Sequence, residues 1–169
     1  MENEQRKTDW RQILLGAGAL GLGILLYVLD RPAEHTYFLP EALSLFSTTP
    51  RMFGNLGNHL PTFLHVLAFC LITSGILGSD KRAALMVCLC WLAIDAVFEI
   101  GQHPSVAARI IPLIPGWFAK VPLLDNTASY FTHGRFDPAD LASILLGAMC
   151  AYALIRILIA KPVVVRQPL

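Results

Sequence analysis

The sequence predicts an all-α membrane protein with four transmembrane helices and one long connection that is interfacial or re-entrant. Two observations predict this fold class. The 169-residue chain is 55% hydrophobic and only 15% charged, which is more apolar than a water-soluble domain. Four long apolar stretches also approach the roughly 20 residues needed to cross a bilayer core. We expect a single membrane domain over residues 1–169, with spans at about 13–29, 60–78, 83–100 and 141–160.

The first span, Ile13 to Leu29, reads ILLGAGALGLGILLYVL and holds no charged residue. Its length just reaches the lower limit of about 17 residues for a membrane helix. It is longer than a typical signal-peptide core and no small-residue cleavage motif follows, so we expect an uncleaved span. Ala17–Gly21 and Ala19–Gly23 are small residues four apart, a spacing that lets membrane helices approach closely.

A mixed segment, Asp30 to His59, precedes the second span. Its stretch FLPEALSLF favours a short helix lying in the membrane interface. The second span, Leu60 to Gly78, has Pro61 in its first turn, where a missing N–H costs nothing. His65 lies about one turn inside this span.

The third span, Ala83 to Ile100, is reached through the tight polar turn 79–82. It carries Asp95 and Glu99 near its end. Two carboxylates four residues apart share one helix face and repel each other. Either a cation neutralises them, or one of the two keeps its proton.

The connection from Gly101 to Asp140 is rich in proline and includes the apolar stretch IIPLIPGWF. That stretch is too short to span, so it should lie in the interface or dip back into the membrane. The fourth span, Leu141 to Ala160, follows Asp137-Pro138, which is a helix-start signal. Asp140 would then lie in the first turn, where a negative charge suits the helix dipole.

Lysine and arginine residues indicate the orientation of the spans. They are dense at both ends of the chain and in the turn between the second and third spans, and sparse in the two long connections. Short cytoplasmic segments carry such an excess, so we expect both termini in the cytoplasm and both long connections outside. The dense group is Arg6, Lys7, Arg11, Lys81, Arg82, Arg156, Lys161 and Arg166; the sparse group is Arg31, Arg51, Arg109, Lys120 and Arg135.

This topology should bring ionisable side chains from separate spans to one level near the outer surface. Ionisable groups at membrane depth usually face a bundle interior or a cavity and pair with one another. Arg135 is the cation expected to pair with Glu99 or an aspartate, because its fork of donors fits a carboxylate or a phosphate. The converging residues are His65, Asp95, Glu99, Gln102, Arg135, Asp137 and Asp140.

Three motifs, PTFLHVLAF, FEIGQ and GRFDPADLASILLG, occur in this order from the second span to the fourth. With them the chain resembles the VanZ-like family of small bacterial membrane proteins. The family is named for a protein that gives resistance to lipoglycopeptide antibiotics, and it has no agreed activity. The resemblance therefore implies a cell-envelope setting in the bacterial cytoplasmic (inner) membrane. It implies functional positions at His65, Glu99, Gln102, Arg135, Asp137, Asp140 and Gly147.

The chain departs from the family pattern at two places. Pro61-Thr62 stands where the family often has Asp-Lys, and Ile144 stands where it often has Asn. A family site that needs that Lys or Asn would be altered in this chain.

Three functions remain open. In the first, the polar cluster binds or modulates a membrane lipid or a lipid-linked envelope precursor, with Arg135, Gln102, Asp137 and Asp95 as ligand-binding residues. In the second, the chain is a hydrolase or transferase for a lipid-linked phosphate or sugar, with catalytic candidates His65, Glu99 and Asp140 and with Arg135 stabilising negative charge. In the third, the polar residues cap helices and hold the bundle together.

Several other functions are not expected. A metal version of the enzyme would use His65, Glu99 and Asp140, but no strong ligand spacing supports it, so no metal and no cofactor are predicted. No Lys/Arg-rich run indicates a nucleic-acid partner, and no G-x-S-x-G, H-E-x-x-H or P-loop motif occurs. The histidines expected to be solvated are His35, His59, His103 and His133, and the cysteines expected to be buried are Cys70, Cys88, Cys90 and Cys150.

Overall fold

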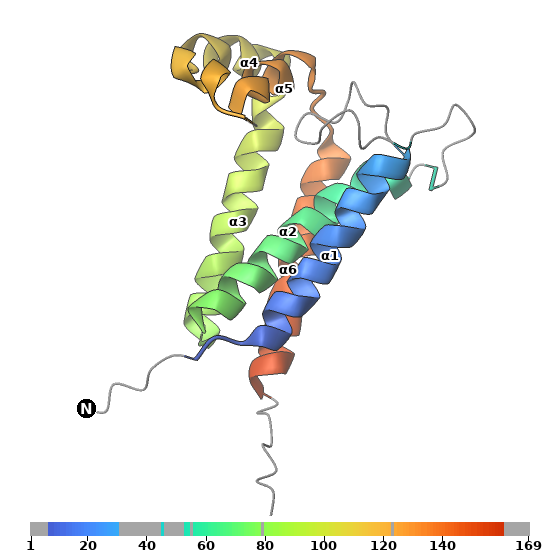
Figure 1. Ribbon diagram of the computed structural model, residues 1–169, viewed down its shortest axis with the longest axis vertical. Helices are drawn as coiled ribbons and strands as arrows, with labels where there is room; N and C mark the ends of the chain where they lie inside the picture. Colours follow the sequence, from blue (N-terminus) through green and yellow to red (C-terminus); the bar gives the residue numbers. More distant parts are fainter. Residues whose placement is uncertain are drawn as a thin grey trace, which may run out of the picture.

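The computed structural model describes residues 7–30, 45, 53–54, 56–78, 80–122 and 124–160, and every regular element in these ranges is helical. Four long helices form the body of the molecule (Figure 1): α1 (Trp10–Asp30), α2 (Leu56–Leu77), α3 (Lys81–Gly101) and α6 (Pro138–Ala160). Each of the four is long and apolar enough to cross a membrane. The predicted all-α membrane fold with four spanning helices is confirmed.

Helix α2 begins earlier than hydropathy predicted. It starts at Leu56 and not at Leu60, so His59 lies on its first turn and Pro61 lies inside the helix. The helix therefore carries a proline in its second turn, where a ring without an N–H leaves one carbonyl of the preceding turn without its usual partner. Polar residues are tolerated in the added turn because the end of a membrane helix reaches the polar headgroup region.

Helix α1 packs along α2, and glycines bring the two backbones close together (Figure 1). A Cβ added to Gly16 would meet the carbonyl oxygen of Ala68 at 2.8 Å, and one added to Gly23 would lie 3.6 Å from Leu64 Cβ. Of the predicted small-residue pairs, Ala17–Gly21 does not line this interface, because nothing lies within 4 Å of a Cβ at Gly21. The interface follows a seven-residue spacing, which is close to two helical turns and keeps both glycines on one face.

Helix α6 packs against α2 and α3 and completes the core. Gly147 allows the closest approach, because a Cβ there would meet the carbonyl oxygen of Phe63 at 2.7 Å. Cys90 and Cys150 lie outside this core and are exposed, so the prediction of four buried cysteines is wrong for these two. The buried core residues are Val66, Cys70, Leu71, Ala84, Cys88, Ile144, Ala148, Ala151 and Ile155.

A polar clamp fastens the end of the bundle where α1 begins. The backbone N–H of Asp9 donates to the carbonyl oxygen of Gly75 at 2.9 Å, which ties α1 to the end of α2. The Arg11 guanidinium donates to the Asp9 carboxylate at 3.0 Å and to the carbonyl oxygen of Leu158 on α6 at 3.1 Å. Arg11 holds the pKa of the Asp9 carboxyl below its ordinary value by hydrogen bonding to it.

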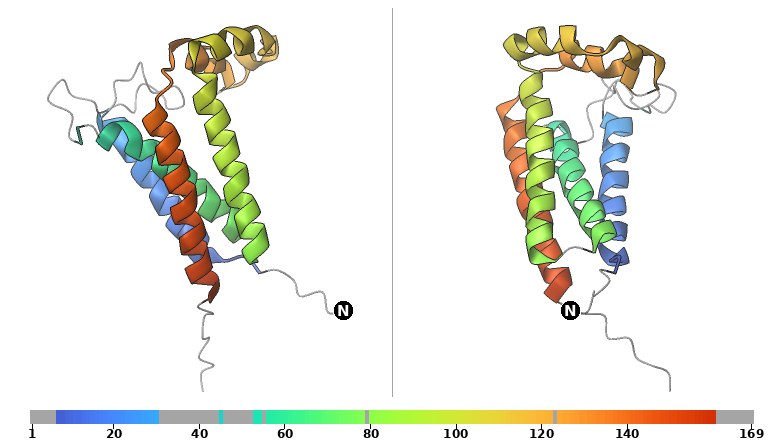
Figure 2. Two further views of the ribbon diagram at one scale, coloured as in Figure 1. Left: turned by 180° about the vertical axis from the view of Figure 1, so that it is seen from behind. Right: turned by 90° about the vertical axis from the view of Figure 1, so that its left-hand side faces the viewer.

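Short helices form a layer at the opposite end of the bundle, beyond the end of α3 and near the start of α6, and they do not descend between the long helices (Figure 2). The apolar stretch predicted to be interfacial or re-entrant belongs to this layer, and its Leu113 and Trp117 are exposed. An interfacial position fits this arrangement. The predicted helix in FLPEALSLF lies outside the described residues. The short helices are α4 (Pro104–Ile110), η3 (Ile111–Leu113), η4 (Gly116–Lys120), η5 (Leu124–Asn126) and α5 (Thr127–His133).

Candidate functional site

Polar side chains from three long helices gather at the end of the bundle that carries the short helices. The start of α2, the end of α3 and the start of α6 lie at this end, opposite the Asp9–Arg11 clamp (Figure 1). The predicted convergence of the second, third and fourth spans at one end is therefore present. The polar residues form three separate groups, centred on Glu99, His59 and His65.

The first group, the Glu99 joint, consists of Glu99, Gln102, Tyr130 and the backbone of Asp137. Glu99 is buried, and each of its carboxylate oxygens accepts one hydrogen bond: Oε1 from the Asp137 N–H at 2.7 Å and Oε2 from Gln102 Nε2 at 3.0 Å. Gln102 Nε2 also donates to the Tyr130 hydroxyl at 2.8 Å. Burial raises the pKa of that phenol, so Tyr130 stays protonated. The joint ties α3 to α5 and to the start of α6.

Gly134 is packed directly onto the Glu99 joint. A Cβ at this position would collide with the side-chain oxygen of Gln102 and with the carbonyl oxygen of Tyr130. Its backbone is extended, at φ −62° and ψ 152°, so other residues could adopt this conformation. Space and not conformational freedom therefore accounts for the glycine.

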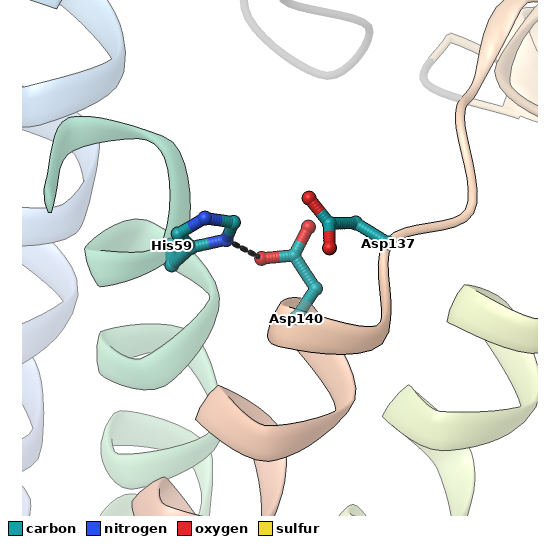
Figure 3. A group of neighbouring side chains, drawn as sticks. All are labelled: His59, Asp137 and Asp140. Atoms are coloured by element: carbon teal, nitrogen blue, oxygen red, sulfur yellow. Dashed lines mark hydrogen bonds and ion pairs between the residues drawn. The ribbon is translucent and has the colours of Figure 1, made fainter. Parts of the chain in front are cut away.

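The second group, the His59 cluster, consists of His59, Asp137 and Asp140 (Figure 3). His59 Nδ1 lies 2.9 Å from Asp140 Oδ1, which joins the first turn of α2 to the first turn of α6. Their side chains are 31% and 17% exposed, so the cluster is partly open to its surroundings. One ligand atom from each of the three residues lies within 4.8 Å of the others. The prediction that His59 lies in a connection is wrong, because α2 begins at Leu56; its side chain is partly exposed and pairs with Asp140.

Asp137 also starts α6, as the sequence predicted. Its Oδ1 accepts the Ala139 N–H at 2.8 Å, and Pro138 occupies the first helical position. Asp140 lies in the first turn as expected, but its carboxylate pairs with His59. Asp137 thus contacts α3 through its N–H and starts α6 through its side chain.

The third group, the His65 pair, lies further from this end of the bundle, and the His65 side chain is 47% exposed. His65 Nε2 is 3.6 Å from Asp95 Oδ1, which is longer than a hydrogen bond, and the imidazole packs at a tilt of 41° against the Phe69 ring with centroids 4.5 Å apart. Asp95 Oδ2 is buried and has no hydrogen-bond partner among the described residues. No hydrogen bond or ion pair in the described part joins His65 to Glu99 or Asp140, so the three catalytic candidates fall into three different groups.

Arg135 does not form the predicted ion pair. Arg135 is exposed, and within the described ranges no hydrogen bond or ion pair connects it to Glu99, Asp137 or Asp140. Neutral donors satisfy Glu99 instead: one backbone N–H and one side-chain amide. These two hydrogen bonds offset part of the cost of burying the carboxyl group.

Comparisons of the chain with protein-family models, with curated proteins and with solved structures gave no match. The resemblance to the VanZ-like family therefore rests on the three sequence motifs. The structure gives their residues physical roles: FEIGQ supplies the Glu99–Gln102 hydrogen bond, and GRFDPADLASILLG supplies Asp137, Asp140 and the close approach at Gly147.

Two residues of the site escaped sequence reasoning. Phe63, Val66 and Cys70 lie on the face of α2 that packs on α6. His59 precedes the apolar run, but it lies four residues before Phe63 and therefore shares this face. This spacing was a signal in the sequence. Tyr130 gave no such signal, because the proline-rich connection before α6 has no helical period that would assign it a neighbour.

Proposed function

We propose that this chain is a VanZ-like integral protein of the bacterial cytoplasmic membrane that binds the polar head of an envelope amphiphile. The amphiphile is a membrane lipid or a lipid-linked precursor of the envelope. The observation that carries the proposal is the partly exposed His59 cluster, which brings His59, Asp137 and Asp140 to the mouth of the bundle. Side chains from two helices that meet at one partly exposed place near the headgroup level can hydrogen-bond a polar head there.

The binding end faces outwards in this proposal. The start of α1, the turn between α2 and α3 and the end of α6 share the opposite end of the bundle (Figure 1). These are the segments in which Lys and Arg are dense. The positive-inside rule then assigns that end to the cytoplasm and the His59 cluster to the outer face.

Other groups at this end of the bundle suit a polar head with an anionic part. Arg135 is exposed and makes no ion pair within the described residues, and its guanidinium fork fits a phosphate bidentately. The His59 and Asp140 side chains supply hydrogen bonds to hydroxyl or ammonium groups. Exposed Leu113 and Trp117 in the short-helix layer provide apolar contact at headgroup level.

The Glu99 joint has a positioning role in this proposal. Both of its carboxylate oxygens already accept hydrogen bonds from the protein. Glu99 is also buried, so a ligand at the mouth of the bundle would have to displace packed groups to reach it. Gln102 already donates to Glu99 and to Tyr130. The two residues therefore hold the start of α6 in place, and the His59 cluster and Arg135 bind the ligand.

A second candidate is a hydrolase or transferase acting on a lipid-linked phosphate or sugar. The distance of 2.9 Å between His59 Nδ1 and Asp140 Oδ1 favours it. A carboxylate on Nδ1 holds an imidazole in the tautomer whose Nε2 accepts a proton, as a general base requires. The Nε2 atom of His59 has no hydrogen-bond partner among the residues described. In this candidate His59 is the base, and Arg135 stabilises charge that develops on the phosphate.

Native mass spectrometry of the purified protein tests the binding proposal, with a polyprenyl phosphate as the probe. We expect one adduct per chain. Arg135→Gln should lower its occupancy at least about fivefold, which corresponds to about 1 kcal/mol, whereas Asp140→Asn should not lower it, because a carboxylate repels the anionic phosphate. Arg109→Gln is the matched control, because Arg109 is an exposed arginine in the same connection. Adducts that do not differ between Arg135→Gln and the control would refute specific binding at this end. Release of inorganic phosphate by the wild type, lost in His59→Gln, would instead establish the enzyme.

A further inference from the structure

The His59 cluster contains a mixed set of metal-ligand atoms on two helices. His59 offers an imidazole nitrogen from α2, and Asp137 and Asp140 offer carboxylate oxygens from the start of α6. Histidine from a second helix distinguishes the cluster from a group of acidic residues at a helix start. All three side chains are neither fully buried nor fully exposed, so an ion could enter and still lose part of its water shell.

The distances suit a small divalent cation. Ligands about 2.1 Å from a metal ion at 90° to each other lie about 3.0 Å apart, and tetrahedral ligands lie about 3.4 Å apart. His59 Nδ1 and Asp140 Oδ1 are 2.9 Å apart, and one ligand atom from each of His59, Asp137 and Asp140 lies within 4.8 Å of the others. The three side chains are therefore close enough for one ion to draw them together.

The protein holds the ligands in place from outside the cluster. The Asp137 N–H is bound by Glu99, and Asp137 Oδ1 accepts the Ala139 N–H. A carboxylate has about four lone-pair sites, so capping α6 leaves Asp137 able to bind a cation as well. Such second contacts orient the ligands in protein metal sites.

The geometry points to a divalent cation site formed by His59, Asp137 and Asp140, with Mn²⁺ or Zn²⁺ as its ion. Two carboxylates provide two negative charges, which balance a divalent ion while His59 binds as a neutral imidazole. Imidazole suits Zn²⁺ and carboxylates suit Mn²⁺, so a site with both selects first-row ions over Ca²⁺. Three protein ligands leave positions for water or for an anionic group. This site stands on its own geometry and does not depend on the amphiphile proposed above.

Manganese titration followed by electron paramagnetic resonance tests the site, because Mn²⁺ loses its free six-line signal on binding. The full chain is purified without a polyhistidine tag and treated with EDTA. We expect about one Mn²⁺ per chain, displaced by Zn²⁺. His59→Gln, Asp140→Asn and Asp137→Asn should each weaken binding at least about tenfold, since losing even a residue that only orients a ligand costs that much. Asn at 137 can still cap α6, so that variant removes charge alone.

Two matched controls separate this site from adventitious binding. His103→Gln and Asp125→Asn change exposed residues at the same end of the molecule, and both should bind Mn²⁺ as the wild type does. Mn²⁺ should also raise the melting temperature of the wild type and of these controls, but not of His59→Gln. A wild type that binds no Mn²⁺ or Zn²⁺ overturns the site. The site is also overturned if His59→Gln binds Mn²⁺ as tightly as the controls. If His59→Gln fails to fold, the same result for Asp137→Asn overturns it.

Discussion

Changing Glu99 to Gln tests the hydrogen bonds of the Glu99 joint with almost no change in size. The carboxylate accepts from the Asp137 N–H at 2.7 Å and from Gln102 Nε2 at 3.0 Å. A glutamine has one acceptor oxygen, and its amide group would face one of these two donors. One hydrogen bond to a charged group is therefore lost and the other becomes a neutral one.

The expected loss follows from these two changes. A hydrogen bond to a charged group contributes about 1.5–3 kcal/mol, and a neutral one about 0.5–1.5 kcal/mol. Losing one and weakening the other should lower the free energy of unfolding by about 2–4 kcal/mol. That is a large part of the roughly 5–15 kcal/mol that holds a typical domain folded.

Chemical unfolding in detergent measures the loss, and hydrogen exchange at the Asp137 amide locates it. The exchange rate of that amide should rise in Glu99→Gln, because its acceptor is removed or weakened. Asp95→Asn is the matched control, since Asp95 lies one turn away on α3 with one buried oxygen that has no described partner. Arg135→Gln should cost less than about 0.5 kcal/mol and should add to Glu99→Gln, because the two residues form no ion pair. An unchanged Asp137 exchange rate in Glu99→Gln would show that the hydrogen bond does not exist.

Three further predictions concern orientation, packing and pH. A single cysteine at Asp125, in a background without native cysteines, should react with an impermeant reagent on intact spheroplasts, and one at Asp80 should not; the reverse pattern would place the site in the cytoplasm. Gly147→Ala should lower the free energy of unfolding by about 1–3 kcal/mol through overpacking, while Gly18→Ala, which has nothing within 4 Å of the new Cβ, should cause no loss. Asp9→Asn should lower the melting temperature near neutral pH. Because Arg11 lowers the pKa of folded Asp9, that difference should shrink as the pH falls below about 4, and a constant difference would refute the clamp.

The sequence was sufficient to predict the spans and the start of α6, because both depend on local properties. Four apolar runs give the four long helices. Asp137 caps α6 and Pro138 opens it because capping involves only neighbouring residues. The site residues Glu99, Gln102 and Asp137 also meet, since the ends of successive antiparallel spans share a level.

The partners within the site were not predictable in the same way. Opposite charge led to the prediction that Arg135 pairs with Glu99. The donors to Glu99 are instead a backbone N–H and a side-chain amide, which are neutral and so are not found by matching opposite charges. His59 was placed in the loop because hydropathy marks the apolar core and not the helix, which continues into the headgroup region. The contacts of Gly134 and Tyr130 with Gln102 arise from the way α5 packs on the end of α3. No periodic pattern in that connection predicts this packing.

The hydrogen bond from the Asp137 backbone N–H to the Glu99 carboxylate is part of a chain of contacts that joins three helices at the mouth of the bundle. The residue that gives this N–H to α3 also starts α6, and one turn later Asp140 reaches α2. Pulling the start of α6 away from α3 would leave a buried Glu99 oxygen without its donor, at a cost of about 1–3 kcal/mol. A ligand at the His59 cluster can open this end only if it binds the open form more tightly than the closed form by at least that amount. A ligand that binds both forms equally would fill the site and leave α3 where it is.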